Sequence, residues 1–242
     1  MEERFSRSAR YREWMAGNMM GPNVLWMLES LCSRIDLRPG MRVMDLGCGR
    51  AISSIFLARE FGVQVWATDL WIPASDNWSR IREASLDDRV FPIHADAGAL
   101  PYADEFFDAI VSIDAYHYFG TDDFYLEKVV RHLKPAGPIA IACPGYRREL
   151  RSDELPDYLR DAHLNRQWHS FHSPEWWREH WEKTGAVEVV VAEEIPEAAE
   201  IWNALAATGD PDAPTITADA GRLLTFSRVV ALRIPRRRDD TG

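Results

Sequence analysis

The sequence has few cysteines, fewer basic than acidic residues, and no long apolar run. Its three cysteines cannot all pair and show no metal-ligand spacing, which predicts reduced thiols. With 28 Lys and Arg against 38 Asp and Glu, the net charge of −10 argues against a nucleic-acid partner, whose phosphates would be repelled. No stretch approaches the ~20 apolar residues of a membrane helix, and the charged start is not a signal sequence. The sequence therefore predicts a cytoplasmic protein without a membrane partner.

An apolar run over residues 42–46 ends at two closely spaced glycines, Gly47 and Gly49. Glycine lacks a Cβ, so the backbone can turn tightly there and approach a ligand. Apolar residues then recur at helical spacing from Ile52, which predicts a helix whose N-terminus can hold a carboxylate or phosphate. A second apolar run, residues 63–69, ends in a carboxylate. The pattern predicts a βαβ unit in which Asp69 binds a ribose.

The spacing of this glycine loop argues against a dinucleotide ligand. A dinucleotide fingerprint has a third glycine where this chain has Ile52. Asp45 would face a cationic group, which suits the ammonium of an amino acid better than a pyrophosphate. The run Asp45-Leu46-Gly47-Cys48-Gly49 resembles the first motif of class I S-adenosylmethionine (SAM) dependent methyltransferases, in the small-molecule type 11 and ubiquinone-biosynthesis-like group. Ala51 departs from that motif, because many members have glycine there.

Later segments follow the order of that family. Residues 94–97 come after a third strand, and the resemblance implies that Asp96 and the backbone of Ala97 hold the adenine, with Leu70 and Trp71 beside its ring. Strands are also predicted over 109–113, 139–143, 186–192 and 224–234. The resemblance implies SAM as cofactor and an α/β, Rossmann-like, doubly wound sheet of seven strands in the order 3-2-1-4-5-7-6, with strand 7 antiparallel.

The chain is interpreted as one methyltransferase domain over residues 1–242. N-terminal helices or a lid occupy 1–40, the SAM-binding core 41–145, and substrate-covering insertions 146–172 and 196–222. Ser173 and Pro174 predict the start of a helix that ends at Gly185. The basic run Arg236–Arg238 is interpreted as a solvated tail.

His117 is the leading candidate for a catalytic base. A sulfonium methyl is already electrophilic, so its transfer needs alignment and dry surroundings more than a protein nucleophile. An acceptor proton must still be removed, and a histidine with a near-neutral pKa suits that role. His117 follows the fourth strand at the carboxyl edge of the sheet, where such folds bind ligands. Packing over the methionine part of the cofactor is the alternative. Asp114 would orient His117 or contact the cofactor, and Tyr116 completes the predicted catalytic set.

Other candidates come from the flanking segments. Tyr11, Asn18 and Met20 close over the cofactor, as N-terminal segments do in similar enzymes, or form a plain connection between helices. Side chains from the insertions and the helix after them are the candidates for acceptor contact: Tyr146, His169, His172, Trp176 and Trp202. No acidic cluster beyond the cofactor carboxylates is present, so no metal is expected.

The predicted function is methyl transfer from SAM to oxygen, nitrogen or carbon of a small organic acceptor. Oxygen or nitrogen is favoured because His117 offers a base. Two alternatives are a SAM-fold enzyme that cyclises or rearranges a product without methyl transfer, and a non-catalytic SAM-binding protein. The acceptor and the oligomeric state do not follow from spacing, and a homodimer is left open.

Overall fold

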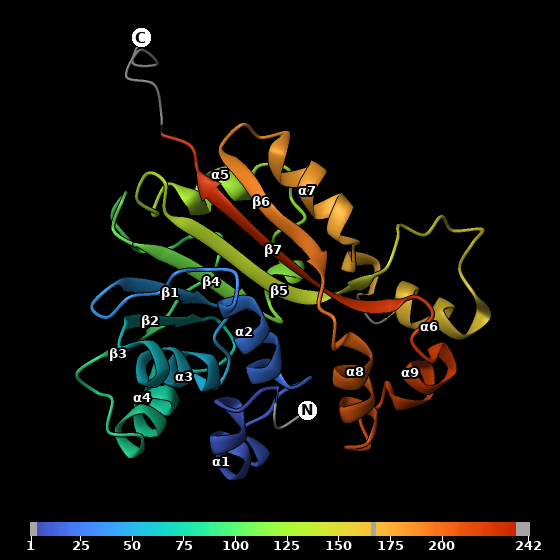
Figure 1. The fold of residues 1–242 in the computed structure, drawn as a ribbon, viewed down its shortest axis with the longest axis horizontal. Helices are drawn as coiled ribbons and strands as arrows, with labels where there is room; N and C mark the ends of the chain where they lie inside the picture. The colour runs from blue at the N-terminus through green and yellow to red at the C-terminus, as the bar shows by residue number, and fades with distance from the viewer. Residues whose placement is uncertain (1–3, 166–167, 236–242) are drawn as a thin grey trace.

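The computed structural model describes residues 4–165 and 168–235, so the basic run Arg236–Arg238 lies outside the described residues. Its sheet has seven strands: β1 (Arg42–Leu46), β2 (Gln64–Asp69), β3 (Val90–His94), β4 (Ala109–Ile113), β5 (Pro138–Tyr146), β6 (Val187–Glu194) and β7 (Leu224–Arg233). They lie in the order β3-β2-β1-β4-β5-β7-β6 (Figure 1). β7 runs antiparallel to β5 and β6, and the other neighbours are parallel. The predicted fold and strand order are confirmed.

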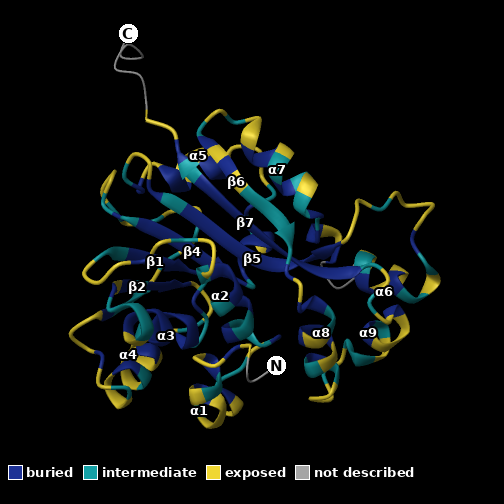
Figure 2. Ribbon diagram, in the orientation of Figure 1, coloured by how far each residue is buried: buried dark blue, intermediate teal, exposed yellow. Residues whose placement is uncertain are grey.

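Helices cover both faces of this sheet. Those named in chain order are η1 (Ser8–Tyr11), α1 (Arg12–Ala16), α2 (Val24–Cys32), α3 (Ile52–Phe61), α4 (Ala74–Glu83), η2 (Tyr116–Tyr118), α5 (Tyr125–Val130), α6 (Asp157–Asn165), η3 (Trp168–Ser170), α7 (Pro174–Glu182), α8 (Ala198–Ala206) and α9 (Ala213–Asp219). Neighbouring residues of β1 point to opposite faces: Val43 packs in the cluster of α2 and α3, and Met44 in the cluster of α5 and α7. Both faces of the sheet are therefore buried (Figure 2), as a doubly wound sheet requires.

The helix boundaries follow the local signals in the sequence. The Ser173 hydroxyl accepts a hydrogen bond from the Trp176 amide at 3.2 Å, Pro174 opens α7, and Gly185 follows it with φ of +66°. The Asn23 side chain accepts from the Trp26 amide in the same way and starts α2. The predicted helix starting at Ser173 is therefore confirmed.

β5 is longer than the predicted strand over 139–143. It pairs with β7 from Pro138 to Tyr146, whereas its pairing with β4 ends at Ala142. Pro144 lies beyond that point, so its missing N–H removes no ladder hydrogen bond on the β4 side. The strand therefore continues past residue 143, its predicted end, and the first insertion begins where the strand ends.

The two insertions form helices that pack beside the end of the sheet (Figure 1). Residues 146–172 contain α6 and η3, and 196–222 contain α8 and α9. The Tyr158 hydroxyl of α6 donates to the Asp219 carboxylate of α9 at 3.0 Å, which joins the two insertions. All three cysteines are free, as predicted. No helix within the described residues is long and apolar enough to cross a membrane.

Candidate functional site

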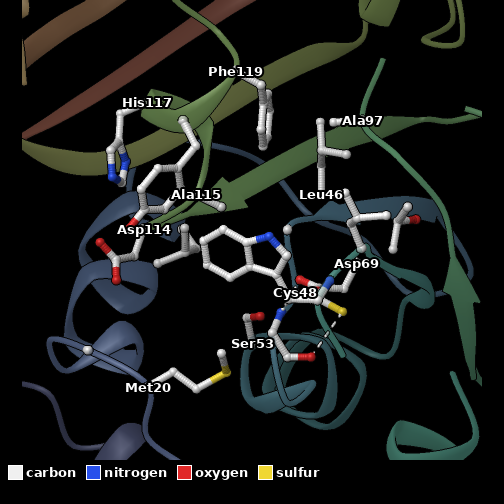
Figure 3. Close-up of a pocket in the computed structure, with 18 of the residues that line it drawn as sticks. Met20, Leu46, Cys48, Ser53, Asp69, Ala97, Asp114, Ala115, His117 and Phe119 are labelled. Carbon is white, nitrogen blue, oxygen red and sulfur yellow. Dashed lines mark hydrogen bonds between the residues drawn. The ribbon is translucent and has the colours of Figure 1, made fainter. Parts of the chain in front are cut away.

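A cavity of about 530 Å³ lies at the carboxyl ends of β1, β2 and β4. β1 is the point where the chain order of the sheet reverses, and ligands of doubly wound folds bind at that point. Predicted site residues on its wall are Asn18, Met20, Gly47, Cys48, Gly49, Asp69, Leu70, Trp71, Asp96, Ala97, Asp114, His117 and His169. Asp69 and Ala97 lie on one side of the cavity, and Asp114 and His117 on the other (Figure 3).

The glycine loop is held at the tip of β1 by close contacts. Gly47 has φ of +76°, and a Cβ built on it would lie 2.3 Å from the Cβ of Ala115. The amides of Gly47 and Cys48 both donate to the Thr68 carbonyl, at 2.8 and 3.1 Å. The loop therefore bridges the ends of β1, β2 and the segment after β4, and only glycine fits at position 47 without displacing a neighbour.

Asp69 organises the end of the cavity that the sequence assigned to a ribose. Its carboxylate accepts backbone N–H groups from Gly49 at 2.8 Å, Trp71 at 2.7 Å and Ile72 at 2.9 Å. A carboxylate has about four acceptor positions, so one is left for a ligand hydroxyl. The same side chain therefore builds the loops on both sides of the cavity and faces its interior.

Asp45 lies beneath the glycine loop and is absent from the cavity wall. Its Oδ2 accepts from the hydroxyls of Ser53 at 2.6 Å and Ser54 at 2.5 Å, and its Oδ1 has no hydrogen-bond partner. Burial raises the pKa of Asp45 to about 6, against the lowering effect of the two hydroxyls. Since Ser53 lines the cavity, this unpaired oxygen lies one side chain behind its wall. Direct contact between Asp45 and an ammonium stays a prediction.

Asp114 and His117 lie on the side of the cavity opposite Asp69, and their side chains have few hydrogen-bond partners. Asp114 follows β4 with φ of +55°, and its amide donates to the Ala142 carbonyl at 2.8 Å. Its carboxylate makes no hydrogen bond or ion pair with the described residues, and burial raises its pKa to about 7. His117 is 2% exposed, packs on Tyr118 and Phe171, and its Nδ1 has no partner. Burial lowers the pKa of His117 to about 3, far from the near-neutral value that suggested a base. Of the two side chains, Asp114 therefore has the pKa closer to neutral pH.

Other predicted site residues lie away from the cavity wall. Tyr116 points into the core against Trp177 and Trp181, because successive side chains of the η2 turn face different sides. The Tyr11 hydroxyl donates to Glu60 at 2.7 Å beside α3. Residue positions explain the remaining four: the Tyr146 hydroxyl lies on the Trp168 carbonyl, His172 pairs with Glu149, Trp176 stacks between His172 and His180, and Trp202 donates to the Thr225 carbonyl.

The cavity also has wall residues that the sequence reasoning missed. Tyr118, Phe119 and Thr121 follow His117 on the wall, and Ser170 joins His169 from the first insertion. Tyr118 could have been found, because it lies in the same short segment at the carboxyl edge. Among the described residues, none from 196–222 lines the cavity. That insertion contacts the first one instead.

The unpaired Asp114 carboxylate leads to a prediction about stability. Its pKa in the folded protein is above the ordinary value, so its contribution to stability is present below about pH 4 and is lost as the pH rises through about 7. Asp114→Asn, which carries no charge, should raise the free energy of unfolding by about 1–3 kcal/mol near pH 8 and by little near pH 4. Urea unfolding at both pH values measures the difference.

The control for this experiment is the exposed Asp88, which pairs with Arg89 at the surface. Asp88→Asn removes the same charge and should change stability by less than about 0.5 kcal/mol at either pH. A pH-independent effect of Asp114→Asn, or a loss of stability near pH 8, would contradict the prediction.

Comparison with known proteins agrees with this geometry. Residues 43–137 match the family model described as a methyltransferase domain. Methyltransferase GfsG from Streptomyces halstedii is 36% identical over 121 residues, which are 48% of this chain and 42% of that protein. The solved structure of a putative sarcosine dimethylglycine methyltransferase from Galdieria sulphuraria matches with a TM-score of 0.71 at 18% identity, over 88% of this chain and 84% of that one. The cyclase SpnF matches with a TM-score of 0.67 at 20% identity, over 87% and 81%.

The two structural likenesses concern the fold, and the sequence match to GfsG spans less than half of that protein's length. The matched segment contains the glycine loop, Asp69, Asp96, Asp114 and His117. Together with the strand order, it shows a methyltransferase domain over residues 43–137, of the kind that the resemblance to class I SAM-dependent methyltransferases implies.

Proposed function

We propose that this protein transfers a methyl group from SAM to an oxygen, nitrogen or carbon atom of a small organic acceptor. The observation that carries the proposal is one continuous cavity whose wall includes the glycine loop, Asp69, Asp114 and His117, with Asp69 and Asp114 on opposite sides. Its volume of about 530 Å³ lies within the ordinary range for small-molecule sites.

The residues present fit the cofactor. The unpaired Oδ1 of Asp45 lies behind the glycine loop, and Asp69 keeps one acceptor position for a ligand hydroxyl. Asp69 would hold the ribose hydroxyls, Asp96 and Ala97 the adenine, and residues 47–49 the amino-acid end. When bound, SAM supplies an electrophilic methyl group on a sulfonium.

The chain's own residues have to align the acceptor and exclude water. His117 and Ala115 are nearly inaccessible to solvent, and His169 and Ser170 from the first insertion complete the wall at the same end. Desolvation of the reacting groups and alignment of the acceptor lower the barrier of a displacement more than a protein nucleophile would. We place the acceptor between Asp114, His117 and His169. A cytoplasmic location and a homodimer remain predictions from the sequence.

The binding of SAM and the release of S-adenosylhomocysteine test the proposal. Calorimetry with SAM should show binding, and incubation with SAM and a panel of small acceptors should release S-adenosylhomocysteine together with a methylated product. Product formed without S-adenosylhomocysteine would favour the cyclisation or rearrangement alternative. Binding without turnover on any acceptor would favour a non-catalytic protein, and a folded protein that does not bind SAM would contradict all three.

Asp69→Ala should weaken SAM binding by about 1–3 kcal/mol, because the ribose hydroxyls lose a charged acceptor. The three backbone amides that now donate to Asp69 would also lose their partner, so the loops should loosen. Calorimetry measures the affinity, and Asp69→Asn serves as the control that keeps the shape and one carbonyl acceptor. Unchanged affinity in Asp69→Ala would refute the ribose assignment.

A further inference from the structure

Asp114 differs from the other carboxylates on the cavity wall. Asp69 accepts three backbone amides, and Asp96 accepts the Gly98 amide at 2.7 Å. The Asp114 carboxylate has no hydrogen bond or ion pair with the described residues, although the residue is partly buried. Withdrawal from solvent without a partner is costly for a carboxylate. A ligand group that pairs with Asp114 would remove that cost.

The backbone around Asp114 is arranged to keep its carboxylate in the cavity. Asp114 adopts φ of +55°, a conformation that costs most residues about 1 kcal/mol and that Asp tolerates better. On the opposite side, a Cβ built on Gly21 would lie 2.9 Å from Asp114 Oδ2. The N-terminal segment therefore leaves space for the carboxylate through a glycine. Two separate local features thus place one unpaired acid at the end of the cavity that holds His117.

The chemistry at this end favours a cation. Tyr118 follows His117 on the cavity wall, and its ring lies 5.3 Å from that of Trp71, the residue that the resemblance places beside the adenine; aromatic faces attract cations. Tyr118 also lies within the electrostatic influence of Asp114 and Asp212. Arg50 is on the wall as well, but it belongs to the glycine loop, where it suits the carboxylate of the cofactor's amino acid. A positively charged nitrogen is the group that Asp114 and these rings can both bind.

The cofactor itself carries one ammonium, and two carboxylates with unpaired oxygens, Asp45 and Asp114, could bind it. The Oδ1 of Asp45 lies behind the glycine loop next to Ser53, on the side of the loop, whereas Asp114 lies with His117. If Asp45 serves the cofactor's ammonium, Asp114 is left for the acceptor. In that position it can bind the protonated acceptor and then accept its proton before the methyl group transfers.

We propose that the acceptor is a primary or secondary amine whose protonated nitrogen binds the Asp114 carboxylate; this inference rests on the proposed methyltransferase function. The ammonium N–H bond breaks and its proton goes to the carboxylate of Asp114. The freed nitrogen lone pair forms the N–CH₃ bond, and the electron pair of the broken S–CH₃ bond stays on sulfur. The product leaves as an N-methylammonium, and Asp114 returns its proton to water.

The proton-accepting group in this scheme is Asp114, while His117 is a positioning residue. Burial brings the pKa of Asp114 to about 7, closer to that of an amine than an ordinary aspartate, and takes the pKa of His117 to about 3. The neutral imidazole can accept a hydrogen bond from the acceptor nitrogen without taking its proton. The favoured acceptor atom is therefore nitrogen.

The first experiment compares three probes with the same ring: benzylamine, benzyl alcohol and benzoate, which are cationic, neutral and anionic. Calorimetry on the protein saturated with S-adenosylhomocysteine should show benzylamine binding at least about 10-fold more tightly than the other two. Asp114→Asn should lose about 10-fold or more of the benzylamine affinity, and Asp88→Asn, which removes a surface charge, should retain it. Equal binding of the three probes, or a preference that survives Asp114→Asn, would overturn the proposal.

The second experiment separates the acceptor from the cofactor. 5′-Methylthioadenosine lacks the ammonium and carboxylate that S-adenosylhomocysteine carries. Asp114→Asn should bind both compounds within about threefold of the wild-type affinity. A loss of about 10-fold for S-adenosylhomocysteine alone would mean that Asp114 holds the cofactor's ammonium, and would overturn the acceptor assignment. A wild-type protein that binds neither compound would instead contradict the proposed function.

Folding of the variant is checked separately. Asn has the shape of Asp and tolerates the left-handed backbone conformation at least as well, so Asp114→Asn should unfold cooperatively. With SAM and a panel of primary and secondary amines, wild-type protein should form N-methyl products that mass spectrometry identifies. Exclusive methylation of oxygen or carbon across a panel that includes alcohols, phenols and carboxylic acids would overturn the proposal.

Discussion

Gly47→Ala is expected to abolish measurable SAM binding and to lower the free energy of unfolding by about 2–4 kcal/mol. The new Cβ would lie 2.3 Å from the Cβ of Ala115, far inside contact distance, and the backbone has φ of +76°. Either the tip of β1 or the segment after β4 must move, and both carry the cavity wall. Calorimetry with SAM and urea unfolding measure the two effects.

Gly40 provides the matched control for this substitution. It has φ of +84°, but nothing lies within 4 Å of a Cβ built there. Gly40→Ala should therefore show only the backbone cost of about 1 kcal/mol and normal SAM binding. Adding Ala115→Gly to Gly47→Ala removes the clashing atom and should restore part of the stability. If Gly47→Ala is no worse than Gly40→Ala, the close approach to Ala115 has no role in the site.

His117→Ala is expected to lower turnover about 100-fold, because the acceptor loses its alignment, while SAM affinity stays within about twofold. His117 is buried at the end of the cavity opposite Asp69, and its Nδ1 lacks a partner in the folded protein. Removing the ring takes away a hydrogen-bonding nitrogen and the surface against which the acceptor aligns. Steady-state kinetics and calorimetry with SAM separate the two parameters.

His117→Phe distinguishes the nitrogen from the ring. Phenylalanine keeps a flat ring against Tyr118 and Phe171 but offers no acceptor. If the nitrogen positions the acceptor, both variants lose turnover; if the ring only packs, His117→Phe stays active. Since the pKa of His117 is about 3, the wild-type pH profile should show no histidine step near neutrality, and a step that disappears in His117→Ala would restore the general-base assignment.

Most of the fold could be predicted because its signals are local. Apolar runs that end in acids and glycines mark the ends of β1 and β2, and the Ser173 and Pro174 pair marks the start of α7. These features depend on backbone conformation and side-chain hydrogen bonds within a few residues. β5 was predicted too short because its last residues are held by β7, which lies some eighty residues later in the chain.

Only some of the residues predicted for the candidate site line the cavity. Residues on strand ends, such as Asp69, Asp96 and Asp114, reach the cavity because the sheet edge fixes where they lie. Tyr116 and Trp176 were also predicted to reach the site from their positions in the sequence. In the structure Tyr116 points into the core, and Trp176 stacks between His172 and His180. The direction of a side chain on a short turn or helix depends on which neighbours pack against it, and sequence spacing does not report those neighbours.

The sequence by itself determined the sheet, the glycine loop and the carboxylate at the end of β2, since each depends on short-range backbone geometry or an ordered set of motifs. Only the tertiary structure decided that Asp45 lies behind the loop, that Asp114 stands without a partner, and that burial moves the pKa values of Asp114 and His117 past each other. Desolvation is set by atoms that distant segments bring around a group. The division of roles between Asp114 and His117 therefore follows from how the whole chain packs around them.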